Sequence, residues 1–460
     1  MAKPYYQDDA VIIYYANCYE VLPPLPDKSI DLLVTDPPYG IGFMGKDWDK
    51  ALPDKQIWVE CLRVLKDGAF AFVMSIPRAD CLSRMIISLE DAGFWVNFTP
   101  IFHAFASGFP KAQNISKAVD KKLGTEREVI GYKESCGYDG GTAVYKHRQK
   151  SLNGQVQTGG MPPITKPATP QAKALNGSYG GFQPKPAVEV VIVAQKPMSE
   201  KTYADQALKN KKGITWLDEG RIPYENEGDK SIALQKNQGN ALINRDKLYG
   251  GYGDLDPNWQ KSGRFPANLC VEDDVLNDGK GHQSSPYPYR ATEPWAGSWD
   301  EHSDFVPLSY SDSGSFSRYF DLDKWFEEKL KELPASVQKT FPFLIVPKAS
   351  KSEKNKGLNY NPEPIKGRDA GQDIRNVPQK ARSTSRINQH PTVKPLKLMS
   401  YLITLGSREG DIILDPFLGS GTTALGCKLL NRKCIGIEIE EKYCEIAAKR
   451  CSQSVMRLET

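Results

Sequence analysis

Several features of common protein classes are missing from this chain of 460 residues. No two of its nine cysteines stand in a CxxC spacing and their number is odd, so neither a zinc site nor a disulfide framework is indicated. No apolar run approaches the roughly 18 residues that a membrane-spanning helix needs. The first residues, MAKPYYQDDA, lack the basic-then-apolar order of a signal peptide. We therefore expect a cytoplasmic protein with reduced, mostly buried thiols, without a bound metal and without a membrane partner.

A strong excess of charge is absent as well. The net charge is +4, which permits a nucleic-acid partner without demanding one. Hydrophobic residues make up 40% of the chain and charged residues 25%, so a sizeable core is expected. At roughly 150 residues per domain, the length suggests about three domains. One local cluster, KASKSEKNKG at 348–357, is either a phosphate-contacting segment or a solvated loop.

Alternating strands and helices are the main pattern at both ends of the chain. Short, apolar and β-branched stretches predict strands at 11–15, 31–36, 69–75, 95–105, 411–416 and 434–439. Helical periodicity predicts helices at 53–68, 78–94, 422–433 and 442–453. Such alternation is typical of an α/β fold with a doubly wound, mostly parallel sheet.

The middle of the chain differs from both ends. Residues 151–186 are rich in Gly, Pro, Gln and Thr, which predicts a long loop or a flexible segment. A strand is predicted at 188–195, as an edge member of the sheet. Residues 196–345 have weak periodicity and aromatics among polar residues, which favours an inserted recognition domain over a purely structural insertion. The predicted parts of the chain are 1–125, 126–345 and 346–460.

A glycine loop lies between a predicted strand and helix near the C-terminus, in DIILDPFLGSGTT. Gly419 and Gly421 allow a tight turn and a close approach of the backbone to a ligand. Glu438 closes the next predicted strand 17 residues after Gly421, the spacing of an acid that binds a ribose diol. No Lys follows Gly421, which disfavours a P-loop, and the third Gly of a dinucleotide motif is missing. The pattern favours a nucleoside-containing cofactor over a tight structural turn.

A second motif, DPPY, ends the predicted strand at 31–36. Pro37 and Pro38 fix φ and remove two N–H donors, so the loop is stiff and its carbonyls stay free. Asp36 and the Pro37 carbonyl can each accept one hydrogen of an exocyclic amino group, while Tyr39 stacks on the ring that carries it. In open α/β sheets, ligands bind at the carboxyl ends of such strands. The alternative for this motif is a plain turn, because Asp-Pro commonly starts turns.

The two acceptors address a chemical problem. The amino nitrogen of adenine or cytosine is a poor nucleophile because its lone pair is delocalised into the ring. Acceptors placed off the ring plane favour a pyramidal nitrogen, and this stabilises the transition state more than the ground state. A methyl sulfonium held by the glycine loop, in line and at near-attack distance, is a suitable electrophile.

These motifs resemble a known family. DPPY, DPFLGSGTT, HPTVKP (390–395) and GIEIEEKY (436–443) are similar to the motifs of amino-group DNA methyltransferases that use S-adenosyl-L-methionine. The catalytic motif precedes the cofactor motif, which is the circularly permuted order of the β class. DPPYGIGFMGKDWD, SGFPKAQNISKAVDKKLG and SGRFPANL also resemble a bacterial and phage branch of site-specific adenine-N6 enzymes. The resemblance implies a Rossmann-like, circularly permuted fold with an inserted target-recognition domain.

The resemblance also implies roles for residues of this chain. Asp36, Pro37, Pro38 and Tyr39 would handle the flipped base. The implied cofactor residues are Asn17, Cys18, Asp36, Thr392, Lys394, Asp415, Pro416, Phe417, Gly419, Ser420, Gly421, Thr422, Thr423, Glu438 and Ile439. Among them Thr392 and Lys394 would border the methionine part, whereas His390 is either a site residue or a plain loop residue. Asn17 departs from the family, which often has Asp there, although its carbonyl oxygen can still accept the bond from the cofactor's adenine.

The sequence also indicates which base or molecule would be methylated. C5-cytosine enzymes need a cysteine nucleophile, typically after proline, and no Pro-Cys dipeptide occurs here. N4-cytosine enzymes more often carry Ser in place of Asp36, so N6-adenine is favoured, with the base extruded from duplex DNA. RNA or protein amino-methyltransferases usually have Asn there and lack a large insert. From another class, a non-catalytic DNA-binding subunit is the alternative, and the intact motifs argue against it.

Partners follow from the same interpretation. We expect double-stranded DNA, and a second copy of the chain and a cognate restriction endonuclease are candidate partners. Basic and aromatic residues that could contact bases or phosphates, with local packing and solvation as the alternative, are Arg245, Trp259, Arg264, Arg290, Lys351 and Lys354.

Overall fold

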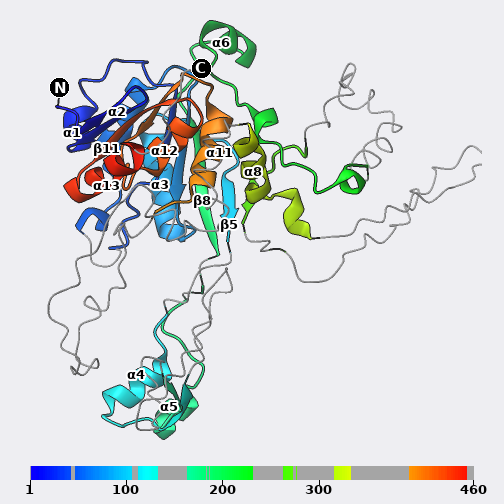
Figure 1. Ribbon diagram of the computed structural model, residues 1–460. Coiled ribbons are helices and arrows are strands. Elements are labelled where there is room, and N and C mark those ends of the chain that lie inside the picture. The colour runs from blue at the N-terminus through cyan, green and yellow to red at the C-terminus, as the bar shows by residue number, and fades with distance from the viewer. Residues whose placement is uncertain are drawn as a thin grey trace, which may run out of the picture. The chain divides into compact units, whose positions relative to one another are not determined.

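The computed structural model divides the chain into two compact units (Figure 1), unit 1 with residues 1–107 and 187–460 and unit 2 with residues 108–186. The residues that the structure describes are 2–42, 47–105, 112–132, 163–182, 184–185, 187–231, 263–272, 276, 315–332 and 393–452. The boundaries expected at 125/126 and 345/346 stay a prediction. Residues 187–231 and the other described parts of the expected insert belong to unit 1.

A nine-stranded sheet forms the centre of unit 1 in its described residues, in the order β1-β2-β11-β10-β3-β4-β8-β5-β9. The strands are β1 (Tyr6–Gln7), β2 (Val11–Tyr15), β3 (Leu32–Thr35), β4 (Phe70–Ser75), β5 (Ile101–Ala104), β8 (Val188–Gln195), β9 (Leu269–Val271), β10 (Ile412–Asp415) and β11 (Lys433–Glu438). Strands β2, β11, β10, β3 and β4 are parallel, β5 is parallel to β9, and β1 and β8 run antiparallel to their neighbours. The predicted mostly parallel α/β sheet is therefore confirmed.

Helices cover both faces of this sheet. The described α-helices of unit 1 are α1 (Cys18–Val21), α2 (Lys55–Val64), α3 (Ala79–Asp91), α6 (Tyr203–Asn210), α8 (Leu322–Lys331), α11 (Leu396–Gly406), α12 (Thr422–Leu429) and α13 (Glu441–Ser452). Successive side chains of a strand point to opposite faces of the sheet. Leu32 and Val34 pack with α11, α12 and α13 on one face, whereas Leu33 packs with α1, α2 and α3 on the other. No helix of the described residues is both long enough and apolar enough to cross a membrane.

Two sequence predictions about strands need correction. The strand expected at 95–105 is paired continuously only over Ile101–Ala104, and Trp95 forms an isolated bridge with Gln195. Pro100 lacks an N–H donor and marks the start of the regular pairing. The strand expected at the edge, β8, lies inside the sheet between β4 and β5. Its run VEVVIVAQ is apolar at consecutive positions because both faces are covered, which is the pattern of an inner strand.

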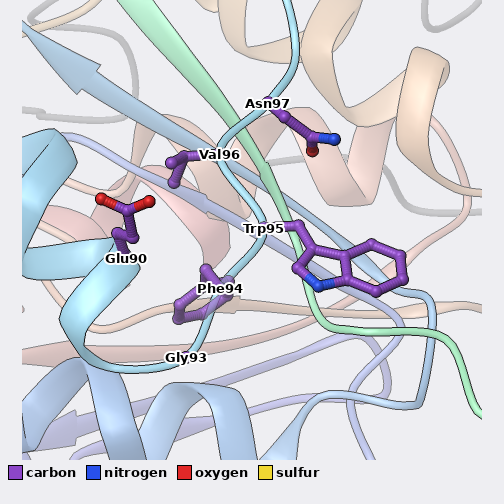
Figure 2. A pocket seen from close by; sticks show the side chains of 6 residues that line it. All are labelled: Glu90, Gly93, Phe94, Trp95, Val96 and Asn97. Atoms are coloured by element: carbon purple, nitrogen blue, oxygen red, sulfur yellow. The ribbon is translucent and has the colours of Figure 1, made fainter.

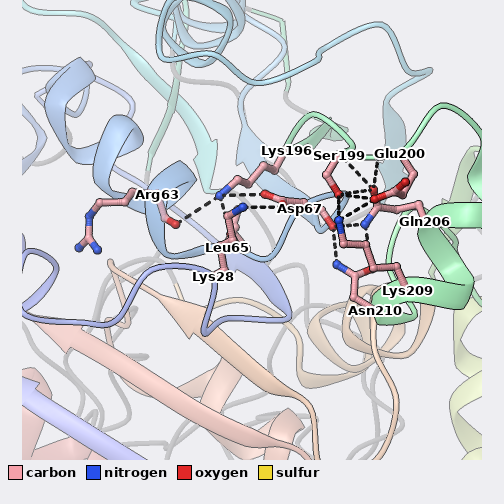
Figure 3. Close-up of polar contacts among 10 residues, drawn as sticks. All are labelled: Lys28, Arg63, Leu65, Asp67, Lys196, Ser199, Glu200, Gln206, Lys209 and Asn210. Atoms are coloured by element: carbon pink, nitrogen blue, oxygen red, sulfur yellow. Dashed lines mark hydrogen bonds and ion pairs between the residues drawn. The ribbon is translucent and has the colours of Figure 1, made fainter.

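Helix α6 is attached through a polar network around Asp67 (Figure 3). The side-chain amides of Gln206 and Asn210 donate to the Asp67 carbonyl oxygen at 3.1 and 2.9 Å. The Gln206 Oε1 atom accepts hydrogen bonds from the backbone N–H groups of Ser199 and Glu200. These contacts join the segment after β8 to the turn before β4, so the start of the expected insert is part of the framework of unit 1.

Helix α11 was not predicted from the sequence. Its residues, LKLMSYLITLG, are buried all around, so the helix lacks the one-sided apolar pattern that marks a surface helix. Its Tyr401 ring packs edge-on against Trp325 of α8 at 4.8 Å between centroids. Lys397 is buried and forms ion pairs with Asp323 and Glu272. Helix α11 therefore links the C-terminal half of the chain to α8 and the β9 strand end.

Unit 2 contains its own small structure. Its described elements are α4 (Ile115–Lys122), β6 (Val129–Tyr132), β7 (Pro163–Thr165) and α5 (Pro170–Ala174). Asp120 is buried and accepts hydrogen bonds from Arg127, from the Ala168 N–H and from Thr169. Burial acts to raise the pKa of Asp120, but these bonds outweigh it and hold the pKa at about 2. The loop expected over 151–186 is thus corrected for residues 163–165 and 170–174, which form β7 and α5.

Candidate active site

The two predicted motifs meet at one edge of the sheet. Strands β3 and β10 are parallel neighbours, with Leu32 opposite Ile413 and Leu33 opposite Leu414. Asp36 follows the end of β3 and Asp415 ends β10, so both carboxylates lie at the carboxyl ends of adjacent strands. Glu438 ends β11, the neighbour of β10 on its other side. Both ends of the chain therefore contribute to one site, as the permuted motif order predicts (Figure 1).

Asp36 is held on both of its oxygens. Its Oδ1 atom accepts a short hydrogen bond from the Tyr39 hydroxyl, and its Oδ2 atom accepts from Lys394 Nζ at 2.7 Å. Lys394 also donates to the Tyr39 hydroxyl at 3.3 Å, and its ammonium lies 5.5 Å from the centre of the Tyr39 ring. The HPTVKP motif thus brings its lysine directly to the DPPY motif.

The charges of this cluster are mutually dependent. Burial raises the pKa of Asp36, and the Lys394 ammonium opposes that shift. Burial alone would lower the pKa of Lys394, but the carboxylates of Asp36 and Glu189 outweigh it and raise the pKa. Glu189, near the start of β8, lies 3.8 Å from Lys394 Nζ. Lys394 is therefore held as a cation between two carboxylates, and it opposes the rise in the pKa of Asp36.

A second carboxylate fixes the DPPY loop. Asp49 is buried, and its Oδ1 atom accepts from the backbone N–H groups of Tyr39 at 2.7 Å and Gly40 at 3.1 Å. Gly40 has φ +70°, and a Cβ there would lie 3.1 Å from the Leu52 nitrogen, so only glycine fits without strain. The loop after the prolines is consequently fixed from the segment that precedes α2.

Asp415 connects the two motifs. Its Oδ1 atom accepts from the Thr35 hydroxyl at 2.6 Å and from the Phe417 N–H at 3.1 Å, and its Oδ2 atom accepts from the Thr423 hydroxyl at 2.6 Å. Burial raises the pKa of Asp415 to about 6, against the effect of these hydrogen bonds. One carboxylate thus aligns the end of β3, the start of the glycine loop and the first turn of α12.

The glycine loop has the predicted backbone. Gly419 has φ +55° and Gly421 has φ +83°, values that L side chains rarely adopt. A Cβ on Gly421 would lie 2.8 Å from the Ala447 Cβ, so the loop also packs closely on α13. The Arg450 guanidinium of α13 donates to the Ser420 carbonyl at 2.6 Å and to the Ser420 hydroxyl at 3.1 Å. The loop is therefore shaped before any ligand arrives.

Glu438 borders this loop and is nearly buried. Its Oε2 atom accepts from the Gly419 N–H and its Oε1 atom from the Glu440 N–H, both at 2.8 Å. No ion pair engages its carboxylate within the described residues. Burial raises the pKa of Glu438 to about 7, against the effect of the two amide hydrogen bonds. An acceptor without a cation partner suits the neutral hydroxyl groups of a ribose.

The surroundings of Glu438 fit a nucleoside-containing group. The next residue, Ile439, is 55% exposed and offers an apolar surface. Phe417 is half-buried, with its ring 6.0 Å from the Trp58 ring. The Cys18 thiol donates to the Pro416 carbonyl at 3.2 Å, and Asn17 caps α1 by accepting from the Tyr19 N–H. The expected contact between Asn17 and a cofactor's adenine stays a prediction beside this capping role.

The structure brings most of the predicted residues together. Asp36, Tyr39, the glycine loop and Glu438 line the same sheet edge, but their catalytic and binding roles stay predictions. Lys394 contacts Asp36 rather than the glycine loop, and its expected position beside a methionine moiety also stays a prediction. Other candidates lie outside the described residues: Arg245, Trp259, Arg290, Lys351, Lys354, His390 and Thr392.

The contacts of Arg264 favour the second of its two interpretations, local packing, over a contact with DNA. Its guanidinium forms an ion pair with Asp229, and its side chain is only 10% exposed. The same group lies over the rings of Tyr319, at 4.5 Å, and Tyr224, at 5.0 Å. These contacts favour local packing over an exposed phosphate or base contact, and the expected DNA contact of Arg264 stays a prediction.

Several residues of the site were missed in the sequence. Thr35 had a signal, because it directly precedes Asp36 and is the one polar residue in the strand sequence LLVT. Asp49, Glu189 and Arg450 had none, because each becomes relevant only through a tertiary contact. No cluster of three or more metal-ligating side chains occurs among the described residues.

A hollow elsewhere on unit 1 does not belong to this site (Figure 2). It is lined by Glu90 and residues 93–97, in the loop from α3 to β5. That loop enters β5 at its amino end, whereas Asp36 follows the carboxyl end of β3, which runs in the same direction. Glu90 is the one charged side chain in its lining, so the hollow lacks the convergent polar groups of the sheet edge.

Comparisons with known proteins extend these observations. The model of a family named for N6 and N4 methyltransferases, and described as DNA methylase, matches residues 30–449. The Type II methyltransferase M2.LlaDCHI of Lactococcus lactis subsp. cremoris is 38% identical over 108 residues, 23% of this chain and 40% of that protein. The Type II methyltransferase M.HpaI of Haemophilus parainfluenzae is 54% identical over 61 residues, 13% of this chain and 19% of that protein. The chain spans less than half the length of these curated relatives.

One solved structure is a more distant neighbour. It is described as PvuII DNA methyltransferase (cytosine-N4-specific) and is 13% identical to this chain, with a TM-score of 0.39 over 100% of this chain and 91% of that one. A likeness at this level is too remote to bear on the choice of substrate.

Proposed function

The chain belongs to the DNA methylase family, and from this premise we propose that it transfers a methyl group from S-adenosyl-L-methionine to an amino group of an adenine in double-stranded DNA. Membership of the family confirms the resemblance seen in the motifs. The donor, the DNA substrate and the N6-adenine target are the proposal. The observation that carries it is the meeting of Asp36 with the glycine loop through the Thr35–Asp415 hydrogen bond at 2.6 Å.

The glycine loop, Phe417, Glu438 and Ile439 are the residues that would hold S-adenosyl-L-methionine. When bound, this cofactor supplies a methyl group on a sulfonium, which is an electrophile for an amino nitrogen. Glu438 would accept hydrogen bonds from the ribose hydroxyls, for which its ionised form is the better acceptor. The rigid loop and the buried Asp415 fix this position before binding, which lowers the ordering cost.

Asp36 would act on the target base. In the structure its Oδ1 atom accepts a hydrogen bond from the Tyr39 hydroxyl, and its Oδ2 atom accepts one from Lys394. An entering base can take over Oδ1 once the Tyr39 hydroxyl releases it, and the Tyr39 ring is then available for stacking. Lys394 can stay on Oδ2, where its charge favours the ionised form of the carboxyl group. The amino group, held by Asp36 and the Pro37 carbonyl, then has its lone pair directed out of the ring plane.

Adenine is proposed over cytosine because of Asp36. Both bases carry an exocyclic amino group, so the site's geometry alone serves either. Serine at this position, which is more frequent in N4-cytosine enzymes, is a neutral acceptor, whereas an aspartate can act as a charged one in its ionised form, which the Lys394 ammonium favours. N4-cytosine methylation is the second candidate, and the matching family spans both activities.

A methylation assay on unmodified plasmid tests the proposal. The full chain is incubated with plasmid and S-adenosyl-L-methionine, and the nucleosides are separated by mass spectrometry. N6-methyl-2′-deoxyadenosine is expected, and N4-methyl-2′-deoxycytidine in its place would favour the second candidate, N4-cytosine methylation. Sequencing of the native DNA then gives the recognition sequence and the methylated strand. Binding of the cofactor without any methylation would instead favour a non-catalytic DNA-binding subunit.

Asp36→Ala separates binding from chemistry. The variant is expected to bind the cofactor with nearly unchanged affinity, because Glu438 and the glycine loop are intact. Methyl transfer is expected to fall by at least about 100-fold, since the charged acceptor of the amino group is lost. Substantial residual activity in this variant would contradict the role of Asp36. Asp80→Ala is the matched control, because that carboxylate is exposed on α3 and its one ion pair within the described residues is with its neighbour Arg78.

A further inference from the structure

Unit 2 carries the positive charge of this protein. Residues 108–186 contain twelve Lys and Arg residues and five Asp and Glu residues, a net charge of +7. The whole chain has a net charge of +4, so the rest of the protein is net negative by three. An excess of positive charge that is confined to one compact unit is typical of a surface that binds a polyanion.

The lysines of unit 2 are largely uncompensated. Two of the five acids of unit 2 form ion pairs within the unit: Asp120 pairs with Arg127 and Glu128 with Lys166. Within the described residues, no ion pair engages Lys117, Lys121, Lys122, Lys173 or Lys185, and all five are exposed. Many exposed lysines of unit 1 differ in this respect, because they lie within ion-pair distance of a carboxylate.

Helix α4 presents three of these lysines together. Ser116 and Asp120 face inward, and Ser116 donates to the Ala172 carbonyl of α5 at 2.8 Å. Lys117 and Lys121 are four residues apart and so lie on one outer side of the helix, with Lys122 beside them. Three cations without carboxylate partners on two turns of a helix can contact successive phosphates.

An exposed aromatic lies in the same unit. The Phe182 side chain is 93% exposed, more than any other large hydrophobic side chain in the described residues. A fully exposed ring is costly in water and is suited to contact the sugar or base faces of a nucleic acid. Together with the free lysines, it favours a nucleic acid over a small anion as the ligand of this surface.

The attachment of unit 2 points to the same partner as the active site. Unit 2 is inserted between β5 and β8, and Ala104 at the end of β5 pairs with Val188 at the start of β8. This pair lies at the carboxyl edge of the sheet. The next residue, Glu189, lies 3.8 Å from Lys394, which holds Asp36. Both connections to unit 2 thus leave unit 1 at the edge where the proposed target base is bound.

We propose that unit 2 is a DNA-clamping module whose α4 lysines bind the phosphate backbone of the duplex that presents the target base. The inference rests on the proposed function. It differs from the expectation that residues 196–345 provide the DNA contacts, because it assigns the sequence-independent part of binding to 108–186. Duplex DNA carries one charge per roughly 1.7 Å of helix axis, so three spaced lysines match it without reading its sequence.

The triple variant Lys117→Gln/Lys121→Gln/Lys122→Gln of the full chain tests the proposal. Affinity for an unmodified duplex is measured at stepped salt concentrations. Each lost phosphate contact lowers the slope of log affinity against log salt by about 0.9, so a decrease of about 2 to 3 is expected, with at least about tenfold weaker binding at 0.1 M salt. Cofactor binding is expected to be unchanged.

The matched control is Lys3→Gln/Lys201→Gln/Lys433→Gln. It removes the same charge from exposed lysines of unit 1, and Lys433 starts β11 at the opposite sheet edge. Its salt slope is expected to stay within about 0.5 of the parent protein. Equal slopes for the two triple variants would overturn the proposal, because the effect would then come from net charge alone. A loss confined to duplex RNA of the same sequence would overturn it too.

The proposed function fails separately. If the parent protein binds no cofactor and methylates no DNA, the methyltransferase proposal fails. If the parent protein methylates plasmid and the α4 variant keeps its DNA affinity and salt slope, only the assignment of unit 2 fails. Phe182→Ala provides a second variant, which is expected to weaken DNA binding severalfold while leaving the salt slope unchanged, since no charge is lost.

Discussion

The Thr35 hydroxyl donates a hydrogen bond of 2.6 Å to Asp415 Oδ1, between residues 380 positions apart in the sequence. Thr35 ends β3 and precedes Asp36, while Asp415 ends β10 and precedes the glycine loop. The bond therefore fixes the end of β3 against the end of β10. It does so inside the protein, because both side chains are buried.

Thr35→Val is expected to destabilise the protein without leaving a cavity, because the two side chains have similar volumes. Asp415 loses a donor to a buried carboxylate, which costs about 1–3 kcal/mol in the free energy of unfolding. Urea denaturation at pH 7.5 measures the loss, and Thr35→Ser is the control that keeps the donor. Since the lost bond favours the ionised carboxylate, the deficit is expected to shrink at pH 5. An equal deficit at both pH values would contradict this account.

Glu438 is expected to make stability depend on pH. Its pKa is about 7 in the folded protein against 4.5 for the ordinary group, so folding favours the protonated form. The resulting stability is fully present below about pH 4.5 and is lost as the pH rises through about 7. For a difference of about 2.5 pKa units, the loss is about 3 kcal/mol. Asp415, with a pKa of about 6, contributes in the same direction.

Glu438→Gln is expected to remove most of this dependence. Denaturation midpoints between pH 4.5 and 8 should decline less steeply for the variant than for the parent protein. Glu441→Gln is the control, because Glu441 is exposed at the start of α13. A variant that keeps the parent's full slope would show that another group causes it.

Cofactor affinity is expected to follow the ionisation of Glu438 in the opposite sense. An ionised carboxylate accepts from both ribose hydroxyls, so binding should tighten as the pH rises towards about 7 and then level off. Below about pH 6, the dissociation constant should rise about tenfold per pH unit. Calorimetry in two buffers of different ionisation heat measures the protons released on binding. In Glu438→Gln the affinity should be lower and nearly independent of pH, and a preserved pH dependence would exclude Glu438 as its source.

Lys394→Met is expected to change the pH profile of methylation. Lys394 counteracts the burial that raises the pKa of Asp36, and an opposite charge at hydrogen-bond distance typically accounts for about 1–3 pKa units. Without it, the acid limb of kcat/KM should move to higher pH by at least about one unit. Lys394→Arg should restore the parent profile in part, because it keeps the cation.

The control for this shift is Lys397→Met. Lys397 is a buried lysine one turn further along the chain, but it pairs with Asp323 and Glu272 instead of Asp36. It is expected to lose stability without moving the acid limb. If both variants moved the limb equally, the shift would reflect a general disturbance of α11.

Much of the fold was predictable because its pattern is local. The run DLLVTD and the DIILDP run are short apolar strands with a functional residue at the end, and the order of their motifs required the two chain ends to meet. Helix α11 was not predictable, because a helix buried on every side shows no amphipathic period. The inner position of β8 was readable only in part, since an apolar run indicates burial but not which strands lie beside it.

The residues of the site also divide into those with a local signal in the sequence and those that only a tertiary contact identifies. Asp36, the glycine loop and Glu438 could be read because glycine and proline constrain the backbone wherever they occur. The pairing of Lys394 with Asp36 could not, because 358 residues separate them and nothing local indicates the contact. The same holds for Asp49, whose role depends on the backbone of Tyr39 and Gly40 coming within reach.

Arg264→Met is expected to act on stability and not on DNA binding. Its guanidinium pairs with Asp229 and lies between two tyrosine rings, so the variant leaves a nearly buried carboxylate with less of its countercharge. Breaking such a pair costs about 3–5 kcal/mol in the free energy of unfolding. At a temperature where the variant stays folded, its salt slope for duplex DNA should equal that of the parent protein. A slope lower by about 0.9 with unchanged stability would instead make Arg264 a phosphate contact.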